Sequence, residues 1–426
     1  MAGIDIISDS TGQMIAESIK ALGMKLNSDK KVYGVHINGA DSNPATRCRY
    51  LLDAIGMAPA KMNYTSGAFD YGDWADAFFM PRPCMLKYDG TVDYYLNEND
   101  LTKKIDGSAS DIANVDYAGN AMMEWGNERG IIWLKIEPDK GDNTSASIYI
   151  ANYKADDGFN RFAFTDINGN DIPHFYTPIF NGSLDSSNRL RSISGQSIMR
   201  SKTAQNEMDY AANNGAGWYI EQYGDRLLID CLLILMGKST DSQTVFGRGF
   251  SENAWDENLL LKTGTMNTKG LFWGENTGKA GVKIFGMENW YGNQWRRTCG
   301  LNLVNGTIKV KLTPSTADGS TVKGYNTDAT GYVTVANSTP SGTSGGYIKT
   351  MLFTALGMFP KSITGSSSTY YCDGGWFNNG INAFAYFGGH LGVSLLCGSR
   401  FVALNYAASG AGWNIGAALS SKPLAH

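Results

Sequence analysis

The C-terminal part of the chain alternates small and large residues in a way that constrains its fold more than any other stretch. Glycine, alanine and serine hold fixed places between Tyr371 and Ser420, and aromatic, amide and charged residues stand between them. Small residues at fixed places suit sharp turns and close backbone packing. The pattern predicts a rigid frame that displays a chemically mixed surface, which is typical of binding and not of a reaction centre.

Composition favours a protein built from short strands, tight turns and long surface loops. The 426 residues include 51 glycines and 12% aromatic residues but only 18% charged residues. This length suffices for one large domain or two to three medium ones. The formal net charge of −4, with no basic stretch interleaved with aromatic residues, argues against a nucleic-acid partner.

The six cysteines form no CxxC pair, and no histidine stands at metal-ligand spacing from them. We therefore expect free thiols, no metal and no cofactor. The start of the sequence has no basic segment followed by an apolar one, as a signal peptide would. The strongest apolar run, 227–236, is about half the length that a membrane span needs. These features predict a soluble chain, not inserted in a membrane, that leaves a bacterial cytoplasm by lysis or within a particle.

Three segments are predicted to be helical. Residues 10–26 have a capping-box start and one apolar stripe, which fits either a docked helix or an attachment and oligomerisation helix. Residues 202–212 carry small and apolar residues at helical spacing. A third helix is expected to begin at an Asp225 cap and to end at Gly237; its apolar residues surround it, which places it in a core.

Strand signals lie on both sides of these helices. A hairpin is expected around the Asp89-Gly90 turn, and another joins 131–136 to 147–151. Ile308, Val310 and Leu312 alternate with polar residues as on a half-buried strand, and 313–346 is predicted to be an excursion or mobile loop. The order of these elements indicates an α+β fold with helices beside an antiparallel sheet.

Motifs for catalysis are weak. The sequence has no GxSxG, HExxH or P-loop pattern. Asp166 opens a stretch like a calcium loop but lacks the required glycine and final acidic residue, so ordinary turn chemistry is favoured. Glu124 and Glu221 each stand near an aromatic residue, as in a glycosidase cleft, but the sequence gives no distance between them.

Two further segments favour structural roles. Residues 241–249 are interpreted as a polar loop that satisfies helix-end carbonyls and buries one arginine. A phosphate site is disfavoured there because its glycines do not precede a helix. Residues 286–295 form an aromatic-rich turn in which Trp290 and Trp295 are expected to be buried.

Taken together, these pieces resemble phage structural proteins of gut bacteria that end in a C-type-lectin-like domain. The resemblance rests first on the C-terminal frame: Gly388-Gly389, Cys397-Gly398, Ala407-Ala408-Ser409 and Trp413-Asn414-Ile415-Gly416-Ala417-Ala418-Leu419-Ser420. Weaker matches lie upstream: Tyr33-Gly34-Val35, Arg82-Pro83-Cys84-Met85-Leu86, Arg191-Ser192-Ile193-Ser194-Gly195, Ser242-Gln243-Thr244 and Gly286-Met287-Glu288-Asn289. In that family the last segment is often the target of a diversity-generating retroelement.

The resemblance implies an α+β, C-type-lectin-like (formylglycine-generating-enzyme-like) domain over 116–426. Two helices would lie beside its antiparallel sheet, and its variable segment would span about 372–422. An attachment or oligomerisation helix (1–30) and a small β-rich region (31–115) would precede it.

The resemblance also implies which tail residues form the binding surface. They are Trp376, Phe377, Asn378, His390, Leu391, Arg400, Phe401, Asn405, Tyr406 and Trp413. For any one of them the alternative is core packing, most of all for Trp413. The stretch 391–396 is more apolar than a typical variable surface, so its exposure is the least secure.

The function that the resemblance implies is non-catalytic receptor binding at the surface of a phage or prophage virion. The ligand would be a host surface protein or glycan, and the other partners would be virion proteins and further copies of the chain, as a trimer. Two alternatives stay open. One is a particle structural or decoration protein, and the other is a polysaccharide-degrading glycosidase.

Overall fold

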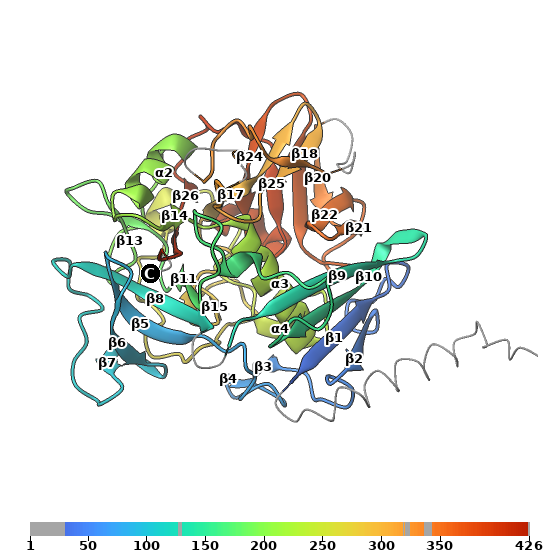
Figure 1. Cartoon of the computed structure of the whole chain (residues 1–426), viewed down its shortest axis with the longest axis horizontal. Coiled ribbons are helices and arrows are strands. Elements are labelled where there is room, and N and C mark those ends of the chain that lie inside the picture. The colour runs from blue at the N-terminus through green and yellow to red at the C-terminus, as the bar shows by residue number, and fades with distance from the viewer. Residues whose placement is uncertain (1–29, 127–129, 318, 320–323, 336–342, 425–426) are drawn as a thin grey trace, which may run out of the picture.

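The computed structural model describes residues 30–126, 130–317, 319, 324–335 and 343–424. It is a β-rich fold with few helices, built around a four-, a seven- and an eight-stranded sheet (Figure 1). The predicted helix at 10–26 lies outside the described residues. In the described ranges, no helix has the length and apolar character needed to cross a membrane.

The four-stranded sheet and the seven-stranded sheet are antiparallel throughout. The strand order of the four-stranded sheet is β2 (Cys48–Leu52), β1 (Val32–Ile37), β10 (Asp142–Ala151) and β9 (Trp133–Asp139). That of the seven-stranded sheet is β14 (Trp218–Ile220), β27 (Leu419–Ser421), β11 (His174–Pro178), β8 (Gly119–Gly126), β5 (Arg82–Lys87), β6 (Val92–Asn97) and β7 (Asp100–Lys104). Both sheets combine strands from before and after position 115, so no sheet divides at the predicted 115/116 boundary.

The eight-stranded sheet contains most of the C-terminal segment. Its order is β19 (Val333–Thr334), β18 (Thr307–Val310), β17 (Trp295–Val304), β24 (Ala383–Phe387), β25 (Val402–Leu404), β23 (Gly374–Asn378) and β20 (Thr343–Tyr347), with β26 (Ile415–Gly416) beside β17. The β23–β25 and β17–β26 pairs are parallel. Four two-stranded pairs complete the strands: β3 (Lys61–Asn63) with β4 (Ala68–Asp70), β12 (Ser183–Leu184) with β13 (Leu190–Arg191), β15 (Lys283–Ile284) with β16 (Met287–Glu288), and β21 (Thr350–Thr354) with β22 (Gly357–Ser362).

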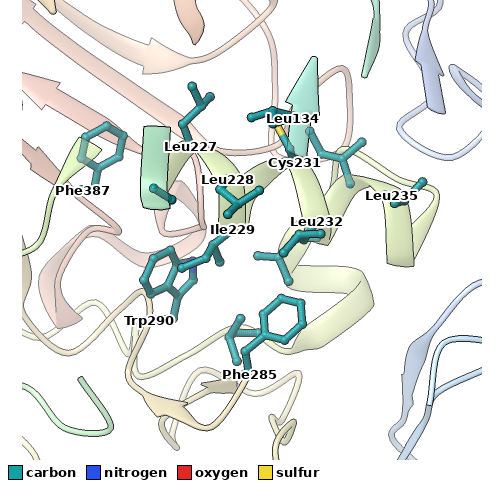
Figure 2. Packing of buried hydrophobic residues seen from close by; sticks show 14 of the residues in the cluster. Leu134, Leu227, Leu228, Ile229, Cys231, Leu232, Leu235, Phe285, Trp290 and Phe387 are labelled. Carbon is teal, nitrogen blue, oxygen red and sulfur yellow. The ribbon is translucent and has the colours of Figure 1, made fainter. Parts of the chain in front are cut away.

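Helix α3 (Tyr223–Gly237) forms the centre of the core, as its all-round apolar sequence predicts. Every residue of α3 is buried, and the helix contacts β17 on one side and β1 and β10 on another. Figure 2 shows Leu227 to Leu235 surrounded by Leu134, Phe285, Trp290 and Phe387. The core therefore ties the eight-stranded sheet to the four-stranded sheet through one helix.

The predicted start of α3 at an Asp225 cap is wrong. The helix begins two residues earlier, and Gln222 is its N-cap. Asp225 instead lies in the first turn, where it pairs with Lys422 at 2.9 Å and accepts a hydrogen bond from Ser420 at 2.9 Å. A buried carboxylate near a helix N-terminus is stabilised by the helix dipole, and here it also holds the C-terminal strand.

The other local predictions have mixed outcomes. Both hairpins are confirmed, as β5–β6 and β9–β10. The strand predicted at Ile308 and Val310 is confirmed as β18, which ends before Leu312. Helix α2 (Ala204–Ala212) is confirmed and is capped by Thr203. The 241–249 loop instead contains a short helix, α4 (Ser242–Phe246), because the side chain of Asp241 caps it at the Thr244 amide.

Candidate functional site

The C-terminal segment forms a two-faced part of the eight-stranded sheet. Alternate side chains of a strand point to opposite faces. On one face Phe377, Leu404 and Phe387 join the main core around α3. On the other face a second, smaller cluster gathers, which we call the outer cluster: Trp295, Tyr386, Val393, Cys397, Phe401, Ala403 and Ile415.

Four glycines predicted to belong to the frame leave no room for a side chain. Gly388 has φ +88°, and a Cβ there would lie 3.0 Å from Tyr291 Cα. Gly389 has φ +83°, and a Cβ would lie 2.7 Å from Cys397 Sγ. A Cβ on Gly398 would overlap the Asp373 carboxylate, and one on Gly416 would lie 2.6 Å from the Met199 carbonyl oxygen. The structural role predicted for these four positions is confirmed.

Arg400 is buried and links two segments of the chain, so the prediction that it is exposed is wrong. Its guanidinium lies 3.3 Å from the Asp373 carboxylate and donates to the Thr240 carbonyl oxygen at 2.6 Å. Its backbone N–H donates to the same carboxylate at 2.9 Å. A buried arginine needs such partners because an unpaired charge is costly to bury. Asp373 belongs to the tail itself, whereas Thr240 comes from the segment that follows α3.

His390 and Leu391 are also buried, contrary to the prediction. His390 packs against Trp255 with ring centroids 4.7 Å apart and against Trp413 at 5.8 Å. Its Nδ1 accepts the Gly392 N–H at 3.1 Å, and burial lowers the pKa of the imidazole to about 4. His390 is therefore an uncharged, buried side chain that packs against the indole rings of Trp255 and Trp413.

Phe377 and Phe401 are buried in the two clusters, so their predicted exposure is wrong as well. Phe401 packs edge-on against Trp295 with centroids 4.6 Å apart. Burying either ring lowers the free energy of the folded chain, because its apolar surface is removed from water. The main signal for their burial is their position on or beside β23 and β25, which the sequence did not reveal.

The other five predicted residues reach the surface. Tyr406 is 52% exposed, while Trp376, Asn378, Asn405 and Trp413 are half-buried. Tyr406 stands beside Tyr386 with ring centroids 5.9 Å apart, and Trp376 packs against the outer cluster. The Oδ1 atom of Asn405 has no hydrogen-bond partner among the described residues.

Two exposed residues that the sequence analysis missed belong to the same surface. Trp255 is 66% exposed and meets His390, and Leu395 is 39% exposed in the 3₁₀ segment η4 (Leu391–Leu396). Gln243 of α4 fixes that segment by donating to the carbonyl oxygens of Leu395 and Cys397, at 2.7 and 2.5 Å. A lone tryptophan within the polar stretch 251–258 was the available signal for Trp255. We call the combined surface the tail face: Trp255, Trp376, Asn378, Leu395, Asn405, Tyr406 and Trp413.

The tail face offers rings and amides for contact, and two acids whose pKa values are raised, Asp373 and Asp230, are buried within the fold. Burial raises the pKa of Asp373 to about 7 and that of Asp230 to about 6, against the opposing effect of Arg400 on both. Both carboxylates are fully engaged inside the fold, with Arg400 and Ser399 respectively. This arrangement suits adaptable binding of a partner surface.

The two glutamates considered for a glycosidase are each held in a separate buried network. Glu124 pairs with Arg82 at 3.0 Å and accepts hydrogen bonds from Tyr95 and Tyr176. Glu221 pairs with Arg226 at 2.8 Å and Arg296 at 3.3 Å. Neither carboxylate lines the cavity described below.

The Asp166 turn and the cysteines have structural roles. The Asp166 carboxylate accepts the backbone N–H groups of Asn168 and Asn170, which is turn chemistry. All six cysteines are buried free thiols. Within the described ranges, no group of three or more His, Cys, Asp or Glu side chains is placed to hold a metal ion.

Comparison with known proteins finds similarity to solved structures only, at low TM-score. No protein-family model and no curated protein matches the chain. Similar solved structures include the Major Tropism Determinant M1 variant, with 14% identity and a TM-score of 0.30, and the U1 variant, with 13% and 0.28. Each alignment covers 80% of this chain and 72% of the other. TM-scores this low do not assign a fold or a function to this chain.

Proposed function

We propose that the chain is a non-catalytic receptor-binding protein of a phage or prophage particle, and that the tail face binds a host surface protein or glycan. The observation that carries the proposal is the division of the C-terminal segment. Glycines without room for a Cβ hold its backbone. Trp255 and Trp413 reach solvent over His390, and Tyr406 does so beside Tyr386 of the outer cluster. Rigid rings with adaptable amides are the contact chemistry of binding surfaces.

The proposed fold is a C-type-lectin-like domain over 116–426. Helices α2, α3 and the short α4 lie in this range with the eight-stranded sheet, whose strands are antiparallel except in the β23–β25 and β17–β26 pairs. The C-terminal strand β27 returns to pair with both β11 and β14. This pairing fixes the end of the C-terminal segment in a sheet, while part of the segment before it reaches the surface. It supports the further proposal that a retroelement diversifies 372–422.

We further propose that the chain acts as a homo-oligomer, with a trimer favoured, on the virion surface and beside other virion proteins. A single tail face offers few exposed rings, so one site would bind weakly. Linking several sites on one particle raises the effective concentration of each after the first has bound. Cyclic symmetry would place all tail faces toward the same cell.

The test uses the full chain, fluorescently labelled, on a panel of gut bacterial isolates analysed by flow cytometry. The variant Trp255→Ala/Tyr406→Ala removes two exposed rings and leaves the frame intact. The control, Ile55→Ala/Ile105→Ala, removes two exposed apolar side chains far from the tail in sequence. We expect staining of at least one isolate to fall at least tenfold in the ring variant only.

Two results would contradict the proposal. Equal staining by the ring variant and the parent would remove the tail face from binding. Staining of no isolate, together with specific binding to particles lacking this protein, would favour a decoration protein instead.

A further inference from the structure

A sizeable cavity among the described residues lies away from the tail face. Its volume is about 550 Å³, within the range of small-molecule sites. It opens between α2, β14 and the 325–328 loop, on the side of the molecule where Figure 1 shows α2 and β14 together. No residue of the tail face lines it, so it is a second, separate candidate site.

Aromatic and aliphatic side chains form the floor and one wall of the cavity. Trp218, Ile220 and Tyr325 are buried, and Tyr219 is half-buried. The Tyr219 and Tyr325 rings meet edge to face, with centroids 6.1 Å apart and planes at 88°. The Trp218 indole N–H is engaged by the Tyr88 carbonyl at 2.8 Å, and the Tyr325 hydroxyl by Gln222 at 2.8 Å. These groups are fixed and present apolar surface.

Two polar atoms of lining residues are buried without a hydrogen-bond partner among the described residues. They are the Tyr219 hydroxyl and the Asn326 Oδ1 atom. Leaving such atoms unpaired costs about 1–3 kcal/mol each, so a small shift of these two side chains that lets a ligand in the cavity pair with them would be favoured. One can donate and the other accepts, which suits a ligand that carries hydroxyl groups.

Among the described lining residues, the charged side chains of the rim are all acidic. Asp209 and Asp328 are exposed at the cavity edge, and Gln205 donates to Asp209 at 2.9 Å. Neither lysine, arginine nor histidine is among the described lining residues. Two carboxylates without a counter-charge repel anionic ligands and accept hydrogen bonds from hydroxyl groups.

We propose that this cavity binds a neutral saccharide unit. A pyranose ring has one face of C–H groups, which would lie on Tyr219, and hydroxyl groups at its edge, which would donate to Asp209 and Asp328. The Tyr219 hydroxyl and Asn326 Oδ1 would pair with the remaining hydroxyl groups. This site does not depend on the tail face and could serve a chain of any function.

The test is saturation-transfer NMR on the full chain with four separate probes. These are methyl β-glucopyranoside, methyl β-galactopyranoside, methyl α-mannopyranoside and N-acetylglucosamine, each at millimolar concentration. Glucuronate, glucose 6-phosphate and indole form the comparison set. We expect a signal from at least one neutral sugar, and none of the comparison compounds should compete with it.

Variants locate the site. Tyr219→Phe keeps the ring but removes the hydroxyl, so the dissociation constant should rise about five- to tenfold. Asp328→Asn, at an exposed position where the amide oxygen can still accept the Thr330 N–H that Asp328 accepts at 3.0 Å, should weaken binding by a similar factor. The controls Tyr210→Phe on α2 and Asp116→Asn elsewhere should bind as the parent does.

Three outcomes would overturn the proposal: no signal from any of the four neutral sugars, unchanged binding in both Tyr219→Phe and Asp328→Asn, or stronger binding of a comparison compound. None of these outcomes bears on the cell-staining test of the tail face, because the two sites share no residue.

Discussion

Trp290 donates its indole N–H to the hydroxyl oxygen of Ser399 at 2.7 Å, and so joins the 286–295 turn to the C-terminal segment. The same hydroxyl donates to the Asp230 carboxylate of α3, and the Ser399 carbonyl oxygen accepts from Arg226 at 2.7 Å. One serine thus ties the tail to the buried helix and to the aromatic turn.

Ser399→Ala should lower the free energy of unfolding by about 2–4 kcal/mol. The change leaves a buried N–H on Trp290 and a buried carboxylate on Asp230 without their partner, at about 1–3 kcal/mol each. Urea unfolding followed by tryptophan fluorescence measures the loss. The exposed control Ser409→Ala should change stability by less than about 0.5 kcal/mol. Equal stability of both variants would mean that the Ser399 hydroxyl is not a structural link.

Arg297 anchors α2 to the tail through a fully buried ion pair. Its Nε atom lies 2.5 Å from Glu207, and its Nη2 donates to the Gly410 carbonyl oxygen at 2.8 Å. Arg297→Met should destabilise by about 3–5 kcal/mol, because it leaves Glu207 buried without its partner. The matched control is Arg200→Met, which breaks an exposed pair with Glu257 at 2.9 Å and should cost less than about 1 kcal/mol. Thermal unfolding of both variants measures the loss of stability, and similar losses in the two would contradict the prediction.

Gly388→Ala should destabilise by at least about 2 kcal/mol. The residue has φ +88°, a conformation that costs a residue with a Cβ roughly 1–2 kcal/mol, and the new methyl group would press on Tyr291. Gly380→Ala is the control, since Gly380 is exposed and its backbone is not left-handed. Denaturant midpoints of the two variants should differ clearly, and coincident midpoints would show that the frame tolerates side chains.

His390 should make stability depend on pH between neutral and acid conditions. Burial lowers its pKa from 6.5 to about 4, so the unfolded chain binds more protons than the folded chain in this window. The stability present above pH 6.5 is then lost as the pH falls toward 4, by about 3 kcal/mol for this group. His390→Asn, which keeps a hydrogen-bond acceptor for Gly392, should flatten this part of the curve. Urea titrations at pH 7, 5.5 and 4.5 measure the slope, and an unchanged slope in the variant would refute this assignment.

Local features of the fold were predictable from sequence, while its long-range pairing was not. Asp89-Gly90 encodes its own hairpin, and the apolar run from Leu227 encodes a buried helix. The pairing of β27 with β14 and β11 joins residues about two hundred positions apart or more, which no local pattern reports. Strands β1, β2, β5, β6 and β7 from 31–115 likewise share sheets with later strands, and no local pattern in the sequence reports that pairing.

The site shows the same division. Gly388, Gly398 and Gly416 were predictable as frame because glycine has few other reasons to recur at such places. Arg400 and His390 were predicted to be exposed because the family resemblance places them in the binding surface. Their burial depends on Asp373 and Thr240 for the arginine, and on the surrounding indole rings for the histidine, and only the folded chain brings these partners together.

The tail face should tolerate diversity where the underlying layer does not. Trp376, Asn405, Tyr406 and Trp413 reach the surface, so a library randomised at these four codons should yield mostly folded proteins with melting temperatures within a few degrees of the parent. Randomising Phe377, Leu391, Arg400 and Phe401 instead should leave few folded members, because each change opens a cavity or unpairs a buried charge. Display of both libraries, with protease resistance as the measure of folding, separates the two sets. Similar survival would show that exposure does not decide which tail positions can vary, and would remove the physical basis for diversification on this surface.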